Sequence, residues 1–445
     1  MRRTPIGTLE AHDYLVEEVW EAFRQAATLW DRLGTTDRGP TDVGAARLQR
    51  WQGLVGGEAA WRRRITAAGW SEDAVVAALA APGPPFPADP PGWVYALPLD
   101  PAGPRSADVE GSTSSAVAKQ VSSASFDVMF GGVEGHLGAR AAVGLRNALE
   151  EGLAWLIEPA VNQGQLSWSA RNGGAAQFGG VANPAATLDF LAHMADSGWV
   201  GMLTRLPVLA RLVGQFLHGW HGHVSELVTR LSDDRPALRD HLGIGVDEPI
   251  LDVSWAMSDP HRGRRSVVRL QFASGAVYYK PRSMATAREW NWILEELRHC
   301  GMPFAPSALR IVDRSSHGYV EEVPTGEVAP AAIADWFRSA GALGALMTLF
   351  ECTDVHFENL VAGSGSPYLI DTESAFSPRQ DGTETTTSLL PALCRTGLLP
   401  SGNTPEENVS GLVARGDATS RNLPWSGGRT VSVLDWLEPL GDGFR

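Results

Sequence analysis

Residues 266–301, "SVVRLQFASGAVYYKPRSMATAREWNWILEELRHCG", carry the pattern that decides the fold of this chain. Apolar side chains alternate with other residues on either side of the dipeptide Ser274-Gly275. They are Val268, Leu270, Phe272, Val277 and Tyr279. Alternation with a period of two, interrupted by turn residues, predicts a β-hairpin that buries one face.

The second half of the same stretch predicts an amphipathic helix. Large apolar residues recur there at the spacing of one helix face, namely Trp290, Ile293, Leu294 and Leu297. Gly301 follows this stripe, and a glycine in that place is typical of a helix end. Lys280 ends the second hairpin strand and therefore lies shortly before the helix.

The downstream sequence continues the succession of strands and helices. Residues 309–324, "LRIVDRSSHGYVEEVP", predict a second strand pair, and residues 332–351, "AIADWFRSAGALGALMTLFE", predict a long apolar helix. The helix leads into residues 353–374, "TDVHFENLVAGSGSPYLIDTES", where a polar loop and a turn surround the short strand "PYLID". This order of elements predicts an α+β fold, with a lipid-kinase/protein-kinase-like two-lobed catalytic core over residues 246–445.

The N-terminal half is predicted to be helical. Residues 1–80 form a helical N-terminal region and residues 126–245 a helical subdomain, because apolar residues recur at helical spacing. In the first region the repeat runs through Val16, Val19, Trp20, Phe23 and Ala27. Residues 81–125 are predicted as a Pro/Ser-rich connector, because prolines are dense from residue 82 and residues 110–125, "EGSTSSAVAKQVSSAS", are small and polar.

The composition is that of an ordinary globular protein: 445 residues, 44% hydrophobic and 20% charged. The formal charge of −14 argues against a general nucleic-acid or anionic-membrane binder. Three widely spaced cysteines suggest neither a disulfide framework nor a zinc site. The N-terminus lacks the apolar segment of a signal peptide, and no uncharged apolar run of about 18 residues occurs, so we predict no membrane span and a cytoplasmic location.

Three histidines lie close together in the helical half, at His218, His221 and His223. The first two share a helix face and the third does not, and no carboxylate joins them at ligand spacing. We therefore interpret them as surface and capping residues rather than as a metal site.

A set of polar residues in the C-terminal half has the order that phosphoryl transfer requires. Protein kinases use a strand lysine, an aspartate followed five positions later by an asparagine, and a further aspartate after a short hairpin. Here Lys280 ends a strand, and Asp354 and Asn359 are five positions apart. Asp371 follows a turn and a strand. Each residue alone is typical of a turn or a solvated surface, but their combined order favours a catalytic site.

Two known nucleotide motifs are absent. The sequence has no GxxxxGK[ST], which argues against a P-loop NTPase, and no GxGxxG precedes the hairpin, which argues against an ordinary protein kinase. Instead, "VYYKPRS", "TDVHFENL" and "LIDTES" resemble the dehydratase domain of class II lanthipeptide synthetases of the LanM type. "SDPHRGRRSV" is similar to the family segment that precedes the lysine, and the resemblance runs from about residue 200 to 400.

The resemblance implies that the chain uses ATP and Mg²⁺ to phosphorylate Ser and Thr of a ribosomal precursor peptide, the first step of dehydration to dehydroalanine or dehydrobutyrine. Carried over position by position, Lys280 would hold the ATP phosphates. Asp354 would position or deprotonate the peptide hydroxyl, and His356 would support its loop. Asn359 and Asp371 would bind Mg²⁺.

The resemblance also covers residues around this centre. Glu373 would be a near neighbour of the metal, and Asp259 and His261 match the segment that lines the phosphate side. Arg282 lies in the motif, where a phosphate contact and a structural ion pair both remain open. For the arginines of "HRGRR" we favour a solvated hairpin edge over a phosphate or leader-peptide contact. An acidic partner of Lys280 is left open between three glutamates, Glu289, Glu295 and Glu296.

Family members are longer than this chain, and the residues that eliminate phosphate and the zinc ligands of the cyclase lie beyond its matching part. The parts for elimination and cyclisation are therefore expected to be absent, and whether this chain alone eliminates phosphate stays open. A fragment, a split enzyme completed by a separate polypeptide and a freestanding kinase all remain open, and the precursor peptide is the expected partner. A non-catalytic peptide-binding subunit of a split synthetase and a small-molecule phosphotransferase are the alternative functions.

Overall fold

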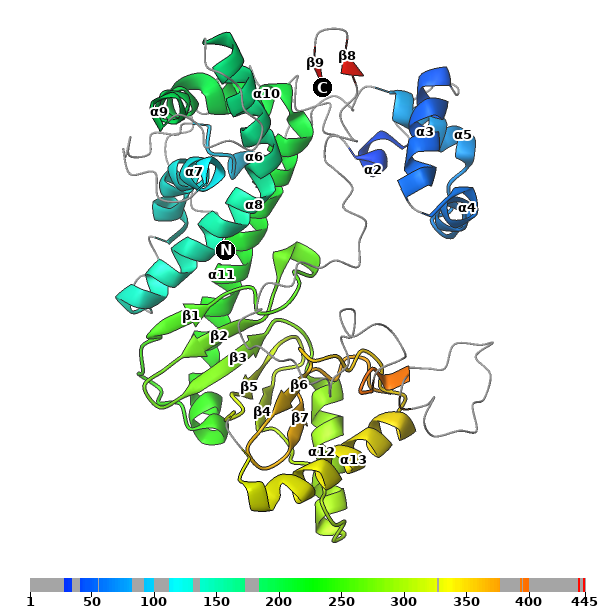
Figure 1. Cartoon of the computed structure of the whole chain (residues 1–445), viewed down its shortest axis with the longest axis vertical. Helices are drawn as coiled ribbons and strands as arrows, with labels where there is room; N and C mark the ends of the chain where they lie inside the picture. Colours follow the sequence, from blue (N-terminus) through cyan, green and yellow to red (C-terminus); the bar gives the residue numbers. More distant parts are fainter. Residues whose placement is uncertain are drawn as a thin grey trace. The chain divides into compact units, whose positions relative to one another are not determined.

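The structure is a computed structural model, and it describes residues 28–33, 41–54, 56–81, 92–99, 112–130, 137–172, 184–325, 328–376, 393, 395–399, 439–440 and 443–444. The described part is a mixture of helices and small antiparallel sheets, an α+β protein (Figure 1). It divides into two compact units. The first comprises Met1–Gly132, Arg146–His223 and Val431–Arg445, and the second comprises Val133–Leu145 and Val224–Thr430.

The first unit is predominantly helical. Its helices are α2 (Leu29–Arg32), α3 (Asp42–Leu54), α4 (Glu58–Ala67), α5 (Glu72–Ala80), α6 (Gly92–Tyr95), α7 (Thr113–Phe130), most of α8 (Ala139–Arg171), α9 (Pro184–His193), α10 (Trp199–Arg205) and the start of α11 (Pro207–Leu242), with a π-helical turn over Met194–Gly198 and strands β8 (Pro439–Leu440) and β9 (Gly443–Phe444). The predicted helical pattern is confirmed over α3 to α5, whereas the repeat from Val16 to Ala27 lies outside the described residues.

The predicted connector over residues 81–125 is wrong in two places. The helix α7 begins at Thr113, where Ser112 Oγ accepts a hydrogen bond from the backbone N–H of Ser115 and so caps the helix. Val117 and Val121 are buried one helical turn apart, so two valines suffice to anchor an otherwise small and polar segment. The four-residue helix α6 also lies among the prolines.

The second unit contains a five-stranded antiparallel sheet with the order β1-β2-β3-β5-β4. Its strands are β1 (Asp252–Ser254), β2 (Val268–Gln271), β3 (Ala276–Lys280), β4 (Ile311–Asp313) and β5 (Gly318–Glu321). The predicted hairpin is confirmed, since Val268 faces Tyr279 across β2 and β3 and Leu270 faces Val277. The helix α12 (Ala285–His299) separates β3 from β4 in the chain, and the predicted strand pair is β4 and β5.

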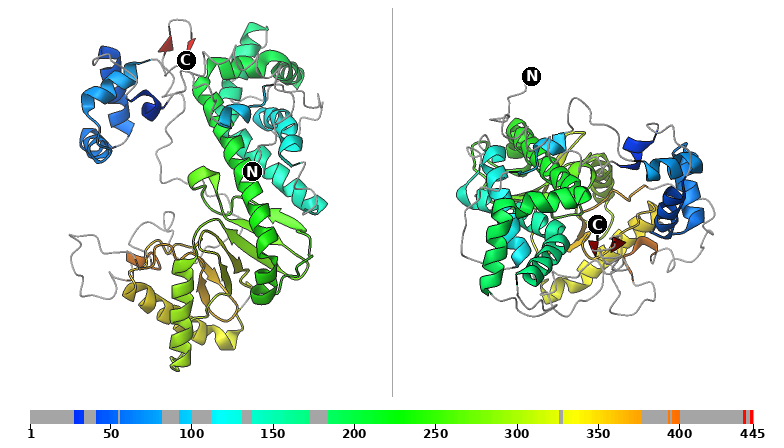
Figure 2. Two further views of the ribbon diagram at one scale, coloured as in Figure 1. Left: turned by 180° about the vertical axis from the view of Figure 1, so that it is seen from behind. Right: turned by 90° about the horizontal axis from the view of Figure 1, so that it is seen from above.

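The rest of the second unit follows the predicted order. The helix α13 (Ile333–Leu349) precedes a small hairpin of β6 (Leu360–Ala362) and β7 (Pro367–Leu369). A buried apolar cluster joins these elements to α12, and it includes Trp290, Leu294, Leu343, Met347, Val355, Leu360 and Leu369. Figure 2 shows the same elements from behind and from above. Single 3₁₀ turns lie at Arg262–Arg264 and Pro330–Ala332.

Polar contacts fix the part of α11 after Val224 to the sheet. Arg230 donates a 2.7 Å hydrogen bond to the hydroxyl of Tyr279 on β3. The buried Asp234 accepts from His317 Nε2 at 2.6 Å and pairs with Arg314 at 2.7 Å. Because the charge of Asp234 is partnered on both oxygens, its burial is tolerated. The Arg230 contact holds β3, the strand that ends in Lys280, and the Asp234 contacts hold the connection between β4 and β5.

Within the described residues, no single helix is long and apolar enough to cross a membrane. One pair, 185–205 with 207–242, passes that test together by length and composition, but the pair is bent by 109°.

Gly318 is a site where an added methyl group has no room. A Cβ atom there would press on Met284 Cγ and lie 2.5 Å from the carbonyl oxygen of Val312, which belongs to the backbone and cannot swing away. We expect Gly318→Ala to lower the free energy of unfolding by about 1–3 kcal/mol. Thermal unfolding tests this against Gly341→Ala, where nothing lies within 4 Å and the helix should gain up to about 1 kcal/mol. Equal unfolding temperatures for the two variants would contradict the close packing of Met284 and Val312 around Gly318.

Candidate active site

Lys280 is the buried cation of the second unit. It ends β3, which is paired with β2 on one side and β5 on the other, so its backbone is fixed by two neighbouring strands. Its side chain is 7% exposed, and Nζ donates a 2.6 Å hydrogen bond to the carbonyl oxygen of Ile370. Burial lowers the pKa of Lys280 to about 8, and the nearby Asp371 carboxylate opposes this shift. The lysine therefore reaches from the sheet to the residue before Asp371.

Asp371 lies just beyond the end of β7 and is held by cations. Arg282 donates from one guanidinium nitrogen to both carboxylate oxygens at 2.7 Å, and the backbone N–H of Glu373 donates to Oδ1 at 3.0 Å. Burial raises the pKa of Asp371, but the charges of Lys280 and Arg282 outweigh burial and leave the pKa below its usual value. Asp371 is therefore ionised at neutral pH.

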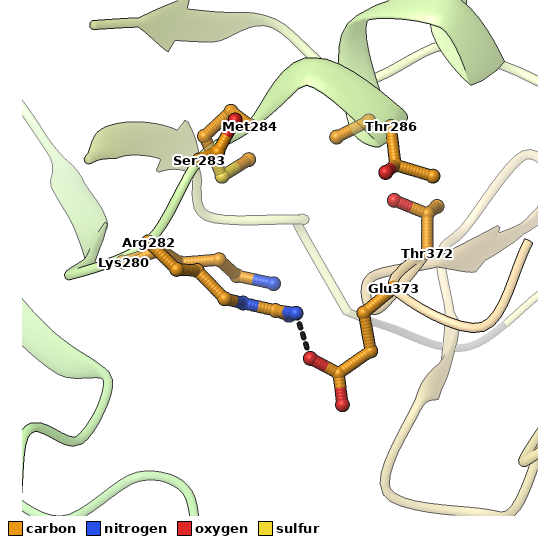
Figure 3. Close-up of a pocket in the computed structure, with 8 residues that line it drawn as sticks. Lys280, Arg282, Ser283, Met284, Thr286, Thr372 and Glu373 are labelled. Carbon is orange, nitrogen blue, oxygen red and sulfur yellow. Dashed lines mark hydrogen bonds and ion pairs between the residues drawn. The ribbon is translucent and has the colours of Figure 1, made fainter. Parts of the chain in front are cut away.

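A small pocket of about 70 Å³ lies beside this ion pair. Figure 3 shows that the side chains of Lys280 and Arg282 point into it, and that Glu373 forms an ion pair with Arg282 at its edge. Thr286 and Thr372 bring two hydroxyl groups close to each other on the opposite side (Figure 3). The walls therefore come from the end of β3, the start of α12 and the segment after β7.

The loop between α13 and β6 carries Asp354, His356 and Asn359. Asp354 has a left-handed backbone with φ of 62°, which aspartate adopts at some cost, and its side chain is 63% exposed. Asn359 Nδ2 donates to the backbone carbonyl of Asp354 at 2.9 Å and to His356 Nε2 at 3.1 Å. His356 Nδ1 accepts a hydrogen bond from the backbone N–H of Glu358 at 3.3 Å and lies 3.7 Å from a carboxylate oxygen of the same residue.

The Asp354 loop and the segment of Asp371 lie side by side. The backbone N–H of Ile370 donates to the carbonyl of Asn359 at 2.9 Å, which extends the β6–β7 pairing by one residue. Ser374 Oγ also donates to the carbonyl of Thr353, 21 residues earlier in the chain. Asn359 and Asp371 therefore lie at the same end of one small hairpin.

A family model described as domain of unknown function (DUF4135) matches residues 206–430, about half of the chain. The chain belongs to this family. The DUF4135 domain is found in lanthipeptide synthetase-like proteins, which agrees with the predicted resemblance in its general form, although the family description names no class of synthetase. The matched region includes both segments of the candidate site. A search of curated proteins found no match.

The donor atoms of the DUF4135 domain fit a hard cation such as Mg²⁺. Both N–H groups of Asn359 are used within its loop, which leaves Oδ1 as its free ligand atom, and Asp371 supplies a carboxylate. Mg²⁺ prefers oxygen ligands and retains waters and substrate phosphates, so two protein ligands suffice. Over the described ranges, no three His, Cys, Asp or Glu side chains cluster as a metal site. Arg282 now occupies both oxygens of Asp371 and would have to release one.

Other predicted residues of the domain lie apart from this centre. Asp259 and His261 are exposed in the connection between β1 and β2, and neither is hydrogen bonded to Lys280 or Asp371 among the described residues. Of the arginines beside them, Arg265 forms an ion pair with Glu226 on α11 at 2.7 Å, whereas a solvated hairpin edge was predicted. The candidate partners of Lys280 on α12 are exposed, and the carboxylates that act on Lys280 are Asp371 and Glu373 instead.

Sequence reasoning missed two kinds of contribution. The carbonyl of Ile370 holds Lys280 through the backbone, so no side-chain pattern could reveal it. Thr286 lines the pocket but belongs to no motif, and Thr372 lies within "LIDTES" without being singled out there. One usable signal was overlooked: of the 37 basic residues of the chain, only Lys119 and Lys280 are lysines. In a chain whose other basic residues are almost all arginines, a lysine at a strand end favours a site that uses a compact ammonium group.

Proposed function

We propose that this chain is an ATP- and Mg²⁺-dependent phosphotransferase that phosphorylates Ser and Thr of a ribosomal precursor peptide, as lanthipeptide dehydratases do. The observation that carries the proposal is the contact of Lys280 Nζ with the carbonyl of Ile370. Among the described residues, Lys280 has the one buried ammonium group, and this contact brings it beside the ionised Asp371. Ile370 also pairs with Asn359 at the end of the β6–β7 hairpin, so Asn359 lies near the same centre. Phosphoryl transfer requires this combination of charges.

The order of elements supports a lipid-kinase/protein-kinase-like two-lobed core. One lobe would be the five-stranded sheet with α12, where the lysine strand lies in the centre. The other would begin with α13 and continue through the Asp354 loop and the β6–β7 hairpin to Asp371. In protein kinases the catalytic loop and the metal-binding aspartate have the same succession. The backbone of Val320 to Val323, where the chain leaves the sheet, is where adenine would bind.

Lys280 and Asp371 would bind different parts of the Mg²⁺–nucleotide complex. The ammonium group of Lys280 would bind nucleotide phosphate oxygens, for which it has N–H donors beyond the one given to Ile370. Asn359 and Asp371 would hold Mg²⁺, which supplies positive charge to the phosphates, and Glu373 would lie near it. Arg282 is poised to exchange its contact with Asp371 for a phosphate once the metal takes that carboxylate.

Asp354 would accept the proton of the attacking peptide hydroxyl. Its carboxylate is solvent-exposed and therefore accessible to a peptide, while Asn359 and His356 fix the backbone that carries it. In the transfer, the bond from the γ-phosphorus to the leaving ADP oxygen breaks and a bond to the Ser or Thr Oγ forms. The hydroxyl proton passes to Asp354. Asp259 and His261 would approach the phosphates only after the β1–β2 connection moves.

Asp354→Asn tests this role. The transition state of phosphoryl transfer is loose and demands little of a base, so we expect a loss in turnover of about 10²-fold with nucleotide affinity unchanged. Asparagine tolerates the left-handed backbone of Asp354, so the fold should be retained. The measurement is the mass increase by phosphate of a synthetic peptide rich in Ser, Thr and Cys, incubated with the chain, ATP and Mg²⁺.

The matched control is Glu358→Gln, which removes an exposed carboxylate from the same loop four positions away. It should retain most of the activity. Equal activity of wild type and Asp354→Asn would exclude Asp354 as the base. A chain that binds the peptide but not ATP would instead be a non-catalytic peptide-binding subunit, and full dehydration would then depend entirely on a partner polypeptide.

A further inference from the structure

Three side chains at the turn between β4 and β5 form a chain of hydrogen bonds that the proposed phosphoryl transfer does not use. Ser316 lies in this turn, and its Oγ is 3.2 Å from Nδ1 of His317. His317 Nε2 is in turn 2.6 Å from a carboxylate oxygen of Asp234 on α11. A serine, a histidine and an aspartate joined in this order are the parts of a nucleophilic catalytic triad.

The partners of His317 determine which ring nitrogen carries the proton. Asp234 also forms an ion pair with Arg314 at 2.7 Å, so its carboxylate accepts on both sides. Nε2 of a neutral His317 therefore donates to Asp234, and Nδ1 is left to accept from the hydroxyl of Ser316. A lone pair on Nδ1 is what a general base needs to take the hydroxyl proton. Relative to the usual triad, the two ring nitrogens exchange their roles.

The base and the aspartate are held in place by burial. His317 is 8% exposed, and its ring centre lies 6.0 Å from that of Tyr279 and 5.9 Å from that of Tyr319. Asp234 is 5% exposed, and Arg314 holds the carboxylate oxygen that His317 does not use. Because both groups are oriented before a substrate arrives, proton transfer requires little reorganisation.

The serine itself is accessible, and an oxyanion donor lies next to it. Ser316 is exposed, and Ser315 before it has a left-handed backbone with φ of 63°, which is costly for residues other than glycine. Among the residues that the structure describes, the backbone N–H of His317 makes no hydrogen bond. Hydrolases with an α/β fold use the N–H group of the residue after the nucleophile to stabilise the oxyanion.

We propose that Ser316 is a nucleophile for acyl transfer, with His317 as its general base and Asp234 as the residue that orients His317. The substrate class is a small ester with a good leaving group, because the hydroxyl lies on an exposed turn. This activity is separate from the proposed phosphorylation and does not rest on it.

The reaction has two steps. In the first, a bond forms between Ser316 Oγ and the carbonyl carbon, the ester C–O bond breaks, and the hydroxyl proton passes through His317 to the leaving oxygen. In the second, water attacks the acyl group on Ser316, and His317 takes a proton from the water and returns it to Oγ. The products are an alcohol and a carboxylic acid.

Labelling of the full chain with a biotinylated fluorophosphonate tests the nucleophile. Ser316 Oγ forms a bond to phosphorus, the P–F bond breaks, and the proton leaves with fluoride. Peptide mapping should find the label on Ser316, and Ser316→Ala should remove it. His317→Gln should be labelled about 10²-fold more slowly, because the base is lost while an amide N–H remains for Asp234.

Ser315→Gly is the matched control, because it removes the neighbouring exposed hydroxyl and glycine accepts the left-handed backbone. It should be labelled at the rate of wild type. Equal rates for wild type and His317→Gln, or no label on Ser316, would overturn the proposal. If His317→Gln fails to fold, the comparison is made within wild type, where equal labelling of Ser315 and Ser316 would overturn it.

Hydrolysis of p-nitrophenyl acetate tests turnover. Wild type should release p-nitrophenol about tenfold faster than Ser316→Ala, beyond the first equivalent of product. Equal rates for the two proteins would show that the contact between Ser316 and His317 only fixes the turn. Ser316→Ala should leave peptide phosphorylation unchanged, so the two activities are tested independently.

Discussion

Replacement of Lys280 by methionine should abolish the proposed phosphoryl transfer and leave the protein folded. The expected loss in turnover is about 10³-fold or more, because a preorganised charge is removed from a site that is shielded from water. Methionine has about the length and volume of the lysine side-chain stem, so the space that the stem fills in the folded protein stays filled. The measurement is peptide phosphorylation, with Lys119→Met as the control. Lys119 is exposed on α7, and its replacement should leave the activity unchanged.

The same variant should be more stable than wild type near neutral pH. The folded-state pKa of Lys280 lies at about 8, below the usual 10.5, so the unfolded chain holds the proton more strongly. The cost of the buried charge is therefore fully present below pH 8 and disappears as the pH rises towards 10.5. Its size is on the order of 3 kcal/mol, part of which the hydrogen bond to Ile370 offsets.

Thermal unfolding of Lys280→Met and wild type at two pH values checks this sign. The variant should unfold at a higher temperature at pH 7, by an amount equivalent to on the order of 1–3 kcal/mol, and the difference should shrink at pH 10. A variant that is less stable than wild type at pH 7 would show that Lys280 is structural. In that case its burial could no longer be attributed to function.

Asp371→Asn is expected to remove the dependence of nucleotide binding on Mg²⁺. The amide keeps the shape of the carboxylate but is a far weaker ligand for a hard cation, so turnover should fall by about 10³-fold. In the absence of metal, the variant should bind ATP as well as wild type or better, because a negative charge near the phosphates is lost. Arg282 keeps Glu373 as its partner, so the pocket remains closed on that side.

Equilibrium dialysis of ATP with and without Mg²⁺ measures this effect. Wild type should bind ATP more tightly with Mg²⁺, and Asp371→Asn should show the same affinity in both conditions. The control is Asp335→Asn, which changes an exposed aspartate in the first turn of α13. An unchanged Mg²⁺ effect in Asp371→Asn would place the metal elsewhere in the chain.

Local patterns were sufficient to predict most of the second unit. The alternation of Val268, Leu270 and Phe272 fixes which face of β2 is buried, and a one-residue slip would expose all three. The end of α12 follows from Gly301, whose φ of 75° is accessible to glycine at little cost. The buried face of β2 and the end of α12 are both determined by residues within the element or next to it, so a short stretch of sequence predicts them.

Tertiary contacts were not predictable in the same way. Lys280 and Ile370 are 90 residues apart, and the acceptor is a backbone oxygen, so neither spacing nor residue type indicates their hydrogen bond. A glutamate on α12 was the expected partner of Lys280, yet Glu289 pairs with its neighbour Arg288 on the exposed surface. The helix α7 was missed because small residues and serines are also typical of connectors, and only the burial of Val117 and Val121 distinguishes it.

Labelling with an amine-reactive acyl phosphate of ATP tests the proposed nucleotide site most directly. Only two lysines are present, and the low pKa of Lys280, about 8, makes its amine the more nucleophilic one at mildly alkaline pH. Peptide mapping by mass spectrometry should find the label on Lys280 and not on Lys119, and ATP with Mg²⁺ should prevent the labelling. Equal labelling of both lysines, or labelling of Lys280 that ATP does not prevent, would contradict a nucleotide site at the end of β3.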